Sequence, residues 1–270
     1  MFNDNELVCF ITGAGRGIGA TAGLALLALG HTVYFTDADE ERARKFVEAL
    51  PESNERAFSL HLDVSSDQSV QKAIDHVGDR HGRINVLINN AGTTNQQPTQ
   101  SIKTEDWNRL IDVHLGGTFR CCRAAFPYLC AAGESSIVNV SSIAARFGLP
   151  IRASYCAAKA GIEGFTRSIA AEWAEFGIRV NAVAPGWVMT ELIHKDLDTG
   201  LVSVDTLKTR ISLKRLAEPS EISNVMMFLA GSSSSYMTGQ VLSVDGGLSI
   251  DLNPGNTAAA TTTASFIRKG

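Results

Sequence analysis

The feature that most limits how this chain can fold is a regular alternation of short apolar runs with longer amphipathic stretches. Apolar runs such as 7–11 and 84–88 are typical of buried strands, whereas 67–80 places its apolar residues on one helical face. Strands that alternate with helices pack as a parallel sheet, because right-handed crossovers lay the helices on its two faces. The alternation therefore predicts an α/β chain with a single doubly wound parallel sheet.

The same pattern assigns a position to each expected element. Strands are expected at residues 7–11, 32–36, 57–62, 84–88, 136–140, 179–184 and 241–244. Helices are expected at residues 20–29, 39–50, 67–80, 104–130, 154–176 and 219–229, the fourth weakened at Gly116-Gly117. No linker or repeat interrupts residues 1–249, so we expect one domain there. Residues 250–270 are rich in Ala and Thr and are expected to be a C-terminal extension, either loosely held or packed on a neighbouring subunit.

Composition excludes several classes of protein. The 270 residues are 44% hydrophobic, which is enough for a sizeable core, and the formal net charge is −4. A weakly acidic chain without a long basic run argues against binding to nucleic acid or to an anionic membrane. The acidic start of the chain is unlike a secretory signal. The five cysteines are an odd number without a C-x-x-C pair, and the histidines lack metal-ligand spacing, so we expect a cytoplasmic protein with no metal site.

A glycine-rich turn, T-G-A-G-R-G-I-G at residues 12–19, follows the first expected strand and leads into a helix. Glycines let the backbone approach a phosphate, and a helix N-terminus offers unpaired N–H groups to an anion. Asp37 ends the second expected strand, where a carboxylate can hold an adenosine ribose and repel a 2′-phosphate. This favours NAD, although Arg16 is a signal for NADP. Asp37 is also a candidate helix N-cap, in competition with Thr36 and Asp39.

A second candidate site is the pair Tyr155 and Lys159, which lies at i and i+4 within an expected helix. That spacing brings a phenol and an ammonium to one helix face. A tyrosine has a pKa of about 10 in water, and a nearby cation lowers it toward the range of a useful base. A serine at the end of the strand 136–140 can bind a substrate oxygen beside the phenol, but periodicity does not decide between Ser141 and Ser142.

Together these segments resemble the short-chain dehydrogenase/reductase family, of the TGxxxGIG and YxxxK type. The matching segments run in the family's order over about residues 5–249. They are T-G-A-G-R-G-I-G (12–19), Asp63-Val64, N-N-A-G (89–92), Ser142, Y-C-A-A-K (155–159), N-A-V-A-P-G (181–186) with Val188 and Thr190, and T-G-Q-V-L-S-V-D-G-G (238–247). The resemblance implies a Rossmann fold and an enzyme that transfers hydride between an alcohol and a nicotinamide dinucleotide.

The resemblance also implies a role for each matching residue. Tyr155 is the expected general acid/base, Lys159 its helper and a ligand of the nicotinamide ribose, and Ser142 the group that polarises the substrate oxygen. Asn89 is expected to tie strands together. The residues expected to bind the cofactor are Gly13, Arg16, Ile18, Gly19, Asp37, Asp63, Val64, Asn90, Ala91, Gly92, Tyr155, Lys159, Pro185, Gly186, Val188 and Thr190.

The chain departs from the family at His114, where the family usually carries an asparagine that belongs to a proton relay reaching the lysine. Histidine both donates and accepts hydrogen bonds and titrates near neutrality, so a relay through His114 with altered pH dependence is one reading. The other is that His114 only packs inside its helix, and that protons move through water alone.

The predicted function is an NAD-dependent oxidoreductase acting on a secondary alcohol. Polar residues such as Glu191 and His194 in the segment 190–218 favour a polyol, sugar or small hydroxy compound. Apolar residues of the same segment would suit an NADP-dependent 3-oxoacyl thioester reductase, which is the alternative, and a non-catalytic cofactor-binding regulator is a more remote one. Arg146, Phe147 and Trp187 are candidate pocket walls. The resemblance implies a homotetramer with helices 104–130 and 154–176 at an interface.

Overall fold

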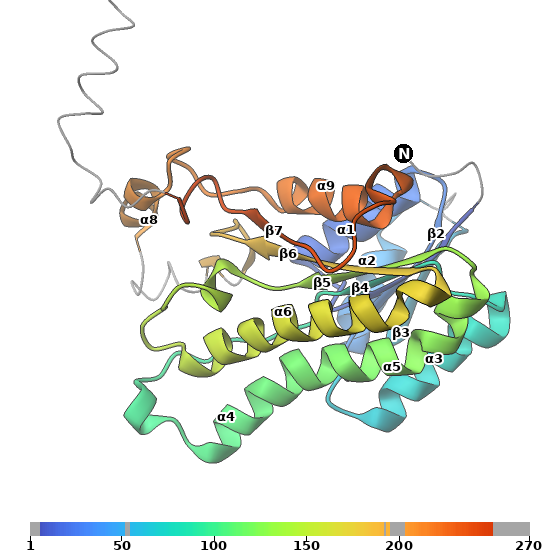
Figure 1. The fold of residues 1–270 in the computed structure, drawn as a ribbon, viewed down its shortest axis with the longest axis horizontal. Helices are drawn as coiled ribbons and strands as arrows, with labels where there is room; N and C mark the ends of the chain where they lie inside the picture. The colour runs from blue at the N-terminus through green and yellow to red at the C-terminus, as the bar shows by residue number, and fades with distance from the viewer. Residues whose placement is uncertain (1–5, 52–54, 192, 195–202, 251–270) are drawn as a thin grey trace, which may run out of the picture.

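The computed structural model describes residues 6–51, 55–191, 193–194 and 203–250, and these residues are built around one parallel sheet (Figure 1). Its strand order is β3-β2-β1-β4-β5-β6-β7, and every neighbouring pair is parallel. The strands are β1 (Val8–Thr12), β2 (Thr32–Asp37), β3 (Ala57–His61), β4 (Val86–Asn89), β5 (Ser135–Val140), β6 (Ile178–Pro185) and β7 (Val241–Val244). The predicted doubly wound α/β fold is confirmed.

Helices cover both faces of this sheet (Figure 1). One face carries α1 (Gly17–Ala28), α2 (Glu40–Glu48) and α9 (Pro219–Ala230), and the other carries α3 (Asp67–His81), α5 (Gly117–Ala131) and α6 (Ala153–Trp173). Shorter elements are α4 (Thr104–Ile111), α8 (Val204–Arg210), η1 (Thr99–Ser101), η2 (Asp112–Gly116), η3 (Ile143–Ala145), η4 (Ala174–Phe176) and η5 (Ser232–Ser234). Among the described residues, no helix is both long enough and apolar enough to cross a bilayer.

Strand alternation divides the interior into two apolar cores. Successive residues of a strand point to opposite faces, so Phe10 packs with α3 and α5 while its neighbours Cys9 and Ile11 pack with α1 and α9. All five residues of β1 are buried, which explains why the run reads as continuously apolar rather than alternating. Covering both faces in this way leaves the edge formed by the strand ends as the place for a site.

The predicted helix 104–130 is divided rather than continuous. A π-helical turn, η2, separates α4 from α5 and ends at the pair Gly116-Gly117. A Cβ on Gly116 would lie 2.7 Å from the Asp112 Oδ1 atom, and one on Gly117 would lie 2.8 Å from the Val64 Cβ atom. The two glycines therefore let the chain pass unusually close to neighbouring groups, and the widened turn is the kind of local irregularity that clusters at functional sites.

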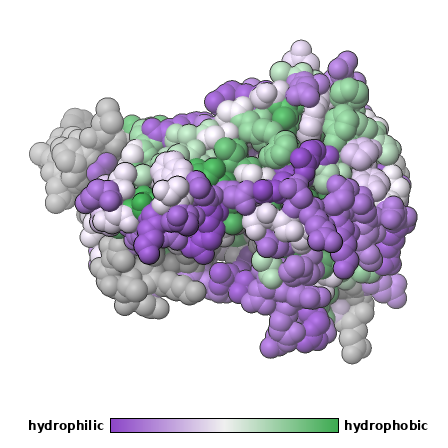
Figure 2. Space-filling model, turned by 90° about the horizontal axis from the view of Figure 1, so that it is seen from below, coloured by the Kyte–Doolittle hydropathy of each residue, from purple (hydrophilic) through white to green (hydrophobic). Residues whose placement is uncertain are grey.

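The helical side of the molecule around α4 and α5 has a mixed surface. Figure 2 shows hydrophilic residues over much of this face, with hydrophobic residues between them. Phe119 of α5 is 43% exposed there and packs edge to face with Phe165 of α6. Residues 251–270 of the expected extension 250–270 lie outside the described residues, as do residues 192 and 195–202 of the segment expected to set substrate choice.

Candidate active site

A cleft of about 1190 Å³ opens at the carboxyl ends of the strands. The residues that leave the sheet there lie in its wall: Gly13 after β1, Asp37 at the end of β2, Asn90 after β4, Ser142 after β5 and Gly186 after β6. Parallel α/β sheets bind their ligands at this edge because every strand delivers its following loop to the same side. The volume exceeds that of an ordinary drug-sized pocket and is large enough for a dinucleotide together with a small substrate.

The cleft gathers nearly all of the predicted site residues. Those that line it are Gly13, Arg16, Ile18, Asp37, Asp63, Val64, Asn90, Ala91, Gly92, His114, Ser142, Tyr155, Lys159, Pro185, Gly186, Val188 and Thr190. Gly19 is not among the lining residues and is buried behind the wall. A Cβ at Gly19 would come within 2.5 Å of the Asn90 Nδ2 atom, so this glycine permits close packing of α1 against the turn after β4.

The glycine-rich turn is shaped to receive an anion. Gly13 and Gly17 have φ values of +62° and +59°, which favour glycine, and a Cβ on Gly13 would lie 2.8 Å from the Ala91 Cα atom. Helix α1 begins at Gly17, and its N-cap residue Arg16 makes no side-chain capping bond. Since Arg16, Gly17 and Ile18 line the cleft, the first-turn N–H groups are available to a pyrophosphate.

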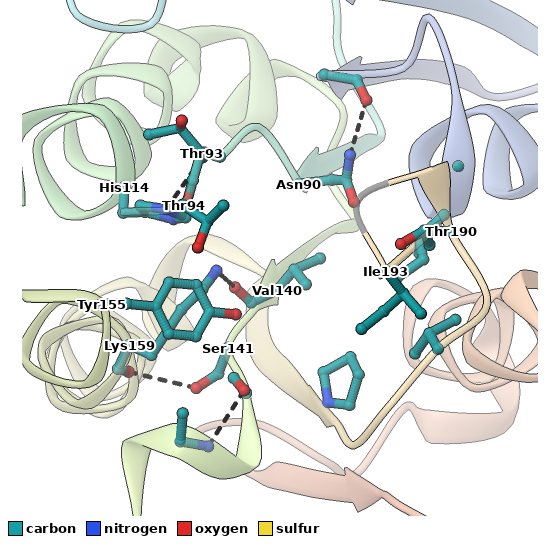
Figure 3. Close-up of a pocket in the computed structure, with 18 of the residues that line it drawn as sticks. Asn90, Thr93, Thr94, His114, Val140, Ser141, Tyr155, Lys159, Thr190 and Ile193 are labelled. Carbon is teal, nitrogen blue, oxygen red and sulfur yellow. Dashed lines mark hydrogen bonds between the residues drawn. The ribbon is translucent and has the colours of Figure 1, made fainter. Parts of the chain in front are cut away.

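Asn90 braces that turn from the neighbouring strand. Its Nδ2 atom donates to the carbonyl oxygens of Thr12 at 3.1 Å and Gly13 at 2.8 Å (Figure 3). Asn89, one residue earlier, donates to the Asn139 Oδ1 atom at 2.9 Å and so ties β4 to β5, as predicted. The two adjacent asparagines therefore have different roles: Asn89 joins two strands of the sheet, and Asn90 supports the glycine-rich turn at the edge of the cleft.

Asp37 presents its carboxylate beside the glycine-rich turn. It accepts hydrogen bonds from the backbone N–H groups of Gly15 at 3.2 Å and Asp39 at 3.0 Å. The helix cap is Asp39, which accepts from the Arg42 N–H group at 3.1 Å, so the alternative of Asp37 as N-cap is wrong. The Arg42 guanidinium lies 3.2 Å from the Asp37 Oδ1 atom and also lines the cleft. Arg42 therefore offsets part of the Asp37 charge.

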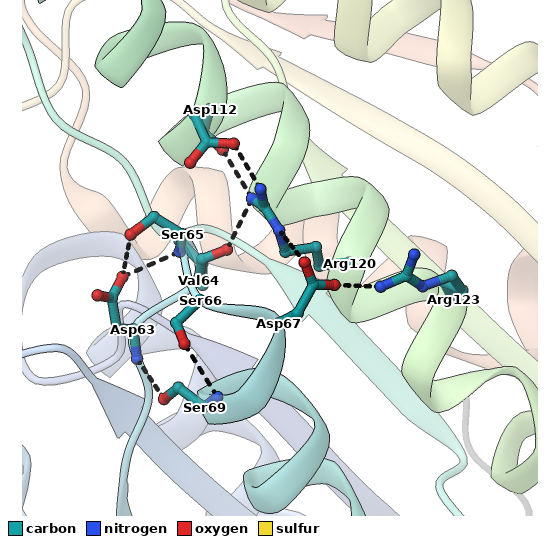
Figure 4. Close-up of polar contacts among 9 residues, drawn as sticks. All are labelled: Asp63, Val64, Ser65, Ser66, Asp67, Ser69, Asp112, Arg120 and Arg123. Carbon is teal, nitrogen blue, oxygen red and sulfur yellow. Dashed lines mark hydrogen bonds and ion pairs between the residues drawn. The ribbon is translucent and has the colours of Figure 1, made fainter.

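Asp63 and Val64 belong to a polar network that fixes the turn after β3 (Figure 4). The Asp63 Oδ1 atom accepts from the N–H and hydroxyl groups of Ser65 at 2.9 and 2.6 Å, which holds the pKa of this carboxyl below its usual range. Arg120 of α5 donates to the Val64 carbonyl at 3.3 Å and to the Asp112 carboxylate at 2.6 Å. One arginine thus joins the turn after β3 to the π-helical turn that carries His114.

Tyr155 and Lys159 meet at the other end of the cleft (Figure 3). The Lys159 Nζ atom is 5.6 Å from the centre of the Tyr155 ring and donates to the Val140 carbonyl at 2.6 Å. The Ser141 hydroxyl lies 3.3 Å from the carbonyl oxygen of Lys159 and from a carboxylate oxygen of Glu163. The Ser142 hydroxyl faces Tyr155 and accepts from the Ala144 N–H group at 3.1 Å. Ser142 is therefore the serine of the pair that adjoins the phenol.

Burial controls the protonation of these groups. It raises the pKa of the Tyr155 phenol, while the Ser142 hydroxyl and the Arg152 guanidinium act in the opposite direction. It also lowers the pKa of the Lys159 ammonium to about 7. The pKa of the Tyr155 phenol therefore stays above its ordinary value, because loss of solvation outweighs the groups that oppose it, and the lowering expected from Lys159 stays a prediction.

Several lining residues were missed by sequence reasoning. They are Arg42, Thr93, Thr94, Arg152 and Arg210, whereas the candidate walls Phe147 and Trp187 were anticipated. Arg146, the third candidate wall, points elsewhere and pairs with Glu163 at 3.3 Å. Arg152 precedes α6 as its N-cap residue with non-helical backbone angles, so helical spacing gave no signal for it.

Comparison with known proteins agrees with this geometry. The family described as Enoyl-(Acyl carrier protein) reductase matches residues 13–249. The 3-oxoacyl-[acyl-carrier-protein] reductase FabG of Thermotoga maritima is 38% identical over 243 residues, which cover 90% of this chain and 98% of that protein. The chain belongs to the short-chain dehydrogenase/reductase family. It is an NAD(P)-dependent oxidoreductase that acts on CH–OH groups.

Two solved structures show the same fold at similar identity. A gluconate 5-dehydrogenase from Burkholderia cenocepacia J2315, in complex with NADP and tartrate, superposes with a TM-score of 0.86 and 32% identity, over 91% of this chain and 96% of that one. An aldohexose dehydrogenase from Thermoplasma acidophilum, in ligand-free form, gives a TM-score of 0.84 and 30% identity, over 94% of this chain and 98% of that one. The comparisons thus fix the family while the named activities of the relatives differ.

In this short-chain dehydrogenase/reductase, His114 stands where the family usually carries the relay asparagine. Its side chain is almost completely buried. The His114 Nε2 atom lies 3.1 Å from the Thr93 amide nitrogen and 2.7 Å from the Thr93 carbonyl oxygen (Figure 3). A neutral ring nitrogen either accepts or donates, so it satisfies one of these two groups at a time. Nδ1 is buried without a hydrogen-bond partner among the described residues.

Burial, assisted by the nearby Lys159 charge, lowers the pKa of His114 to about 3. The expectation that His114 titrates near neutrality is therefore wrong, and its imidazole stays neutral over the range in which an enzyme of this kind works.

The depressed pKa predicts a measurable effect on stability. Between pH 6.5 and about 3, the unfolded chain binds a proton at His114 that the folded chain does not. The free energy of unfolding therefore falls as pH is lowered through this window, by at most about 1.4 kcal/mol per pH unit. His114→Asn removes this contribution, so urea unfolding curves should show a shallower loss of stability for the variant between pH 6.5 and 4.5. Equal slopes for parent and variant would mean that His114 is protonated in the folded chain.

Proposed function

We propose that this chain transfers hydride between a small secondary alcohol and NAD, the alcohol being a polyol, a sugar or a small hydroxy compound. The observation that carries the proposal is the arrangement of one cleft, with Ser142, Tyr155 and Lys159 at one end and Asp37 at the other. The names of the two structural neighbours, a gluconate and an aldohexose dehydrogenase, support an alcohol of this class.

The roles proposed for the side chains follow from their chemistry. When bound, the nicotinamide accepts or supplies the hydride. In oxidation, the ionised Tyr155 oxygen takes the hydroxyl proton of the substrate, and in reduction the phenol returns a proton to the nascent alkoxide. The Ser142 hydroxyl holds the substrate oxygen beside Tyr155. Lys159 holds the nicotinamide ribose and favours ionisation of the phenol, and the neutral His114 supports a chain of proton carriers behind Lys159.

The cofactor contacts are proposed in three groups. Gly13, Arg16 and Ile18 hold the pyrophosphate and the ribose beside it. Gly19, which has no side chain, lets the pyrophosphate come close to the backbone of this turn. Asp37 holds the adenosine ribose, and Asp63 and Val64 hold the adenine. Of the other predicted cofactor residues in the wall, those proposed to frame the nicotinamide half are Asn90, Ala91, Gly92, Pro185, Gly186, Val188 and Thr190.

Two other functions remain open. An NADP-dependent 3-oxoacyl thioester reductase is favoured by the name of the Thermotoga relative and by Arg16, although Arg16 here pairs with Glu191 at 2.5 Å. A non-catalytic cofactor-binding regulator is opposed by the presence of Ser142, Tyr155 and Lys159 in one cleft.

The test of the proposal is the absorbance of reduced nicotinamide with purified protein, using NAD and NADP in parallel over polyols, sugars, hydroxy acids and simple secondary alcohols. We expect turnover with NAD on one of these groups. If none of these alcohols is oxidised but a 3-oxoacyl thioester is reduced with NADPH, the protein is the thioester reductase instead. Dinucleotide binding without any turnover would favour the regulator.

Tyr155→Phe removes the proposed proton carrier but keeps the ring. Turnover should fall by roughly 100-fold or more, the usual scale of a lost general acid/base, while calorimetry should still detect NAD binding. Tyr236→Phe is the matched control, because Tyr236 is fully exposed and does not line the cleft. Retained turnover in Tyr155→Phe would remove Tyr155 from the mechanism.

Asp37→Ser removes the charge expected to oppose a 2′-phosphate. The ratio of kcat/KM for NAD to that for NADP should fall by about 10-fold or more, because like charges in contact repel strongly. The parent should accept NADP to some extent, since Arg42 offsets part of the Asp37 charge. Glu48→Gln, at the exposed end of α2, serves as the control for loss of one negative charge. An unchanged ratio in Asp37→Ser would show that cofactor choice is made elsewhere.

We further propose that the protein is a cytoplasmic homotetramer with α4, α5 and α6 at an interface. Residues 1–249 form the enzyme domain, and residues 250–270 form an extension. The exposed Phe119 ring on α5 supports an interface on this face. Sedimentation equilibrium should give four times the chain mass, and Phe119→Glu should lower it because the substitution places a charge in an apolar contact. An unchanged mass in this variant would remove Phe119 from the interface.

A further inference from the structure

Glu163 of α6 is a buried acid that the cleft does not account for. Its side chain is 7% exposed, and it is not among the residues that line the cleft. It follows Lys159 by four residues and Tyr155 by eight, which places all three on one side of the helix. A carboxylate is costly to bury unless it is paired and hydrogen-bonded, so the partners of Glu163 indicate its role.

The two oxygens of the Glu163 carboxylate contact the two ends of one short loop. The Ser141 hydroxyl lies 3.3 Å from Oε1, and the Arg146 Nε atom lies 3.3 Å from Oε2. Ser141 directly follows β5, and Arg146 is the C-cap residue of η3. The loop 141–146 carries Ser142, the serine that adjoins the phenol. One side chain of α6 therefore contacts both ends of the loop in which this serine lies.

Arg146 extends this contact to the sheet. Its guanidinium donates to the Ser243 hydroxyl at 3.2 Å and to the Val241 carbonyl at 3.4 Å, both on β7. Arg167, a second cation near Glu163, is 59% exposed and lies 3.9 Å from the carboxylate. The far end of the loop is therefore held between α6 and β7, and the buried carboxylate is the partner of its guanidinium on the side of α6.

We propose that Glu163 is a positioning residue, which holds this loop against α6 so that the Ser142 hydroxyl stands beside the Tyr155 phenol. The inference rests on the roles proposed for Ser142 and Tyr155, and it adds a residue that acts through them. The two side chains come from different elements, so their separation depends on how firmly the loop is held. Because a misplacement of about 1 Å caused far from the reacting atoms can lower a rate by roughly 100-fold, such a contact affects turnover.

The contact that Glu163 supports also affects proton transfer. The Ser142 hydroxyl lowers the pKa of the Tyr155 phenol, against the stronger effect of burial, which raises it. Loss of that contact should therefore raise the pKa further, so that a higher pH is needed to form the phenolate. The other titratable and charged groups that face the phenol are Arg152, Cys156, Lys159 and His114, and those that face Glu163 are Arg146 and Arg167.

Glu163→Gln keeps the size of the side chain but removes its charge and one acceptor oxygen. With NAD and the alcohol that the panel above identifies, kcat should fall by about 10-fold or more. The KM for NAD should stay at the parent value, because Glu163 does not line the cleft. The rising limb of the pH–rate profile for oxidation should move to higher pH by about half a unit or more, the equivalent of one ordinary hydrogen bond.

Glu172→Gln is the matched control for this variant. Glu172 lies on the same helix, is exposed and does not line the cleft, so the control loses one negative charge without loss of a buried contact. It should keep the parent kcat and pH–rate profile. If Glu163→Gln keeps them as well, the inference is overturned.

Hydrogen exchange measures the effect on the loop without turnover. The N–H groups of Ser141 and Arg146, at its two ends, donate hydrogen bonds to backbone carbonyls, so they exchange slowly while the loop is held. In Glu163→Gln, exchange in the loop should be several-fold faster than in Glu172→Gln, while exchange in β1 stays the same. Equal exchange in the two variants would contradict a positioning role. Faster exchange throughout the chain would mean that Glu163 serves overall stability alone.

Arg146→Gln releases the far end of the loop without changing the buried acid. Arg146 is 41% exposed, so this variant should fold even if Glu163→Gln does not. It should change kcat and the rising limb in the same directions by smaller amounts, because Ser141 stays attached to α6 through Glu163 and the Lys159 carbonyl. Parent values in Arg146→Gln would mean that its contact with Glu163 does not hold the loop, which overturns the inference.

A double variant separates this inference from the roles on which it rests. Ser142→Ala alone should lower kcat and move the rising limb to higher pH, and adding Glu163→Gln should move the limb no further, because Glu163 acts through Ser142. Additive shifts of the limb would overturn the inference. Parent turnover in Ser142→Ala would instead refute the role proposed for Ser142, and absence of turnover on every alcohol of the panel would refute the proposed function. In either case hydrogen exchange still tests whether Glu163 holds the loop.

Discussion

The structure depends on the parallel pairing of its strands. Because all seven run in one direction, loops far apart in the sequence leave the sheet at one edge. The strand ends also hold the functional groups directly: the Thr12 hydroxyl accepts from the N–H groups of Asn90 and Ala91 at 3.0 and 2.9 Å, and the Val140 carbonyl fixes the Lys159 ammonium. A shift of register by one residue would turn these groups to the wrong face, so pairing and function are specified together.

The second constraint is the exclusion of water from the titratable side chains around Tyr155. Burial acts against the ionised form of three groups that line this part of the cleft: it raises the pKa of the Tyr155 phenol and lowers those of Lys159 and His114. The Tyr155 phenol can serve as a base only if nearby groups restore what desolvation removes. The Ser142 hydroxyl and the Arg152 charge both act in that direction, and they come from different elements, one after β5 and one at the start of α6.

Most of the fold was predictable because buried strands and amphipathic helices leave a periodic signal in the sequence. The π-helical turn at 112–116 was not, and the contact of Arg120 with the Val64 carbonyl beside it joins positions 56 residues apart. The site residues of the family motifs were predictable as a set, whereas Asp37 needed the observed capping by Asp39 to exclude the role of helix N-cap. Arg42 and Arg152 escaped prediction because long cationic side chains on helices usually lie in solvent, and only tertiary packing turns them inward.

The charges in the cleft explain how a chain with a net charge of −4 can bind anions. A dinucleotide is negative, and the overall charge of the protein opposes its approach. Attraction must come from local features, and the uncapped start of α1 in the wall of the cleft is one of them. Under the proposed function, Asp37 opposes an additional phosphate on the adenosine ribose, and Ser142 and Tyr155 act on the substrate. Cofactor selection would then depend on a different part of the cleft from the chemistry, so that one can change without loss of the other.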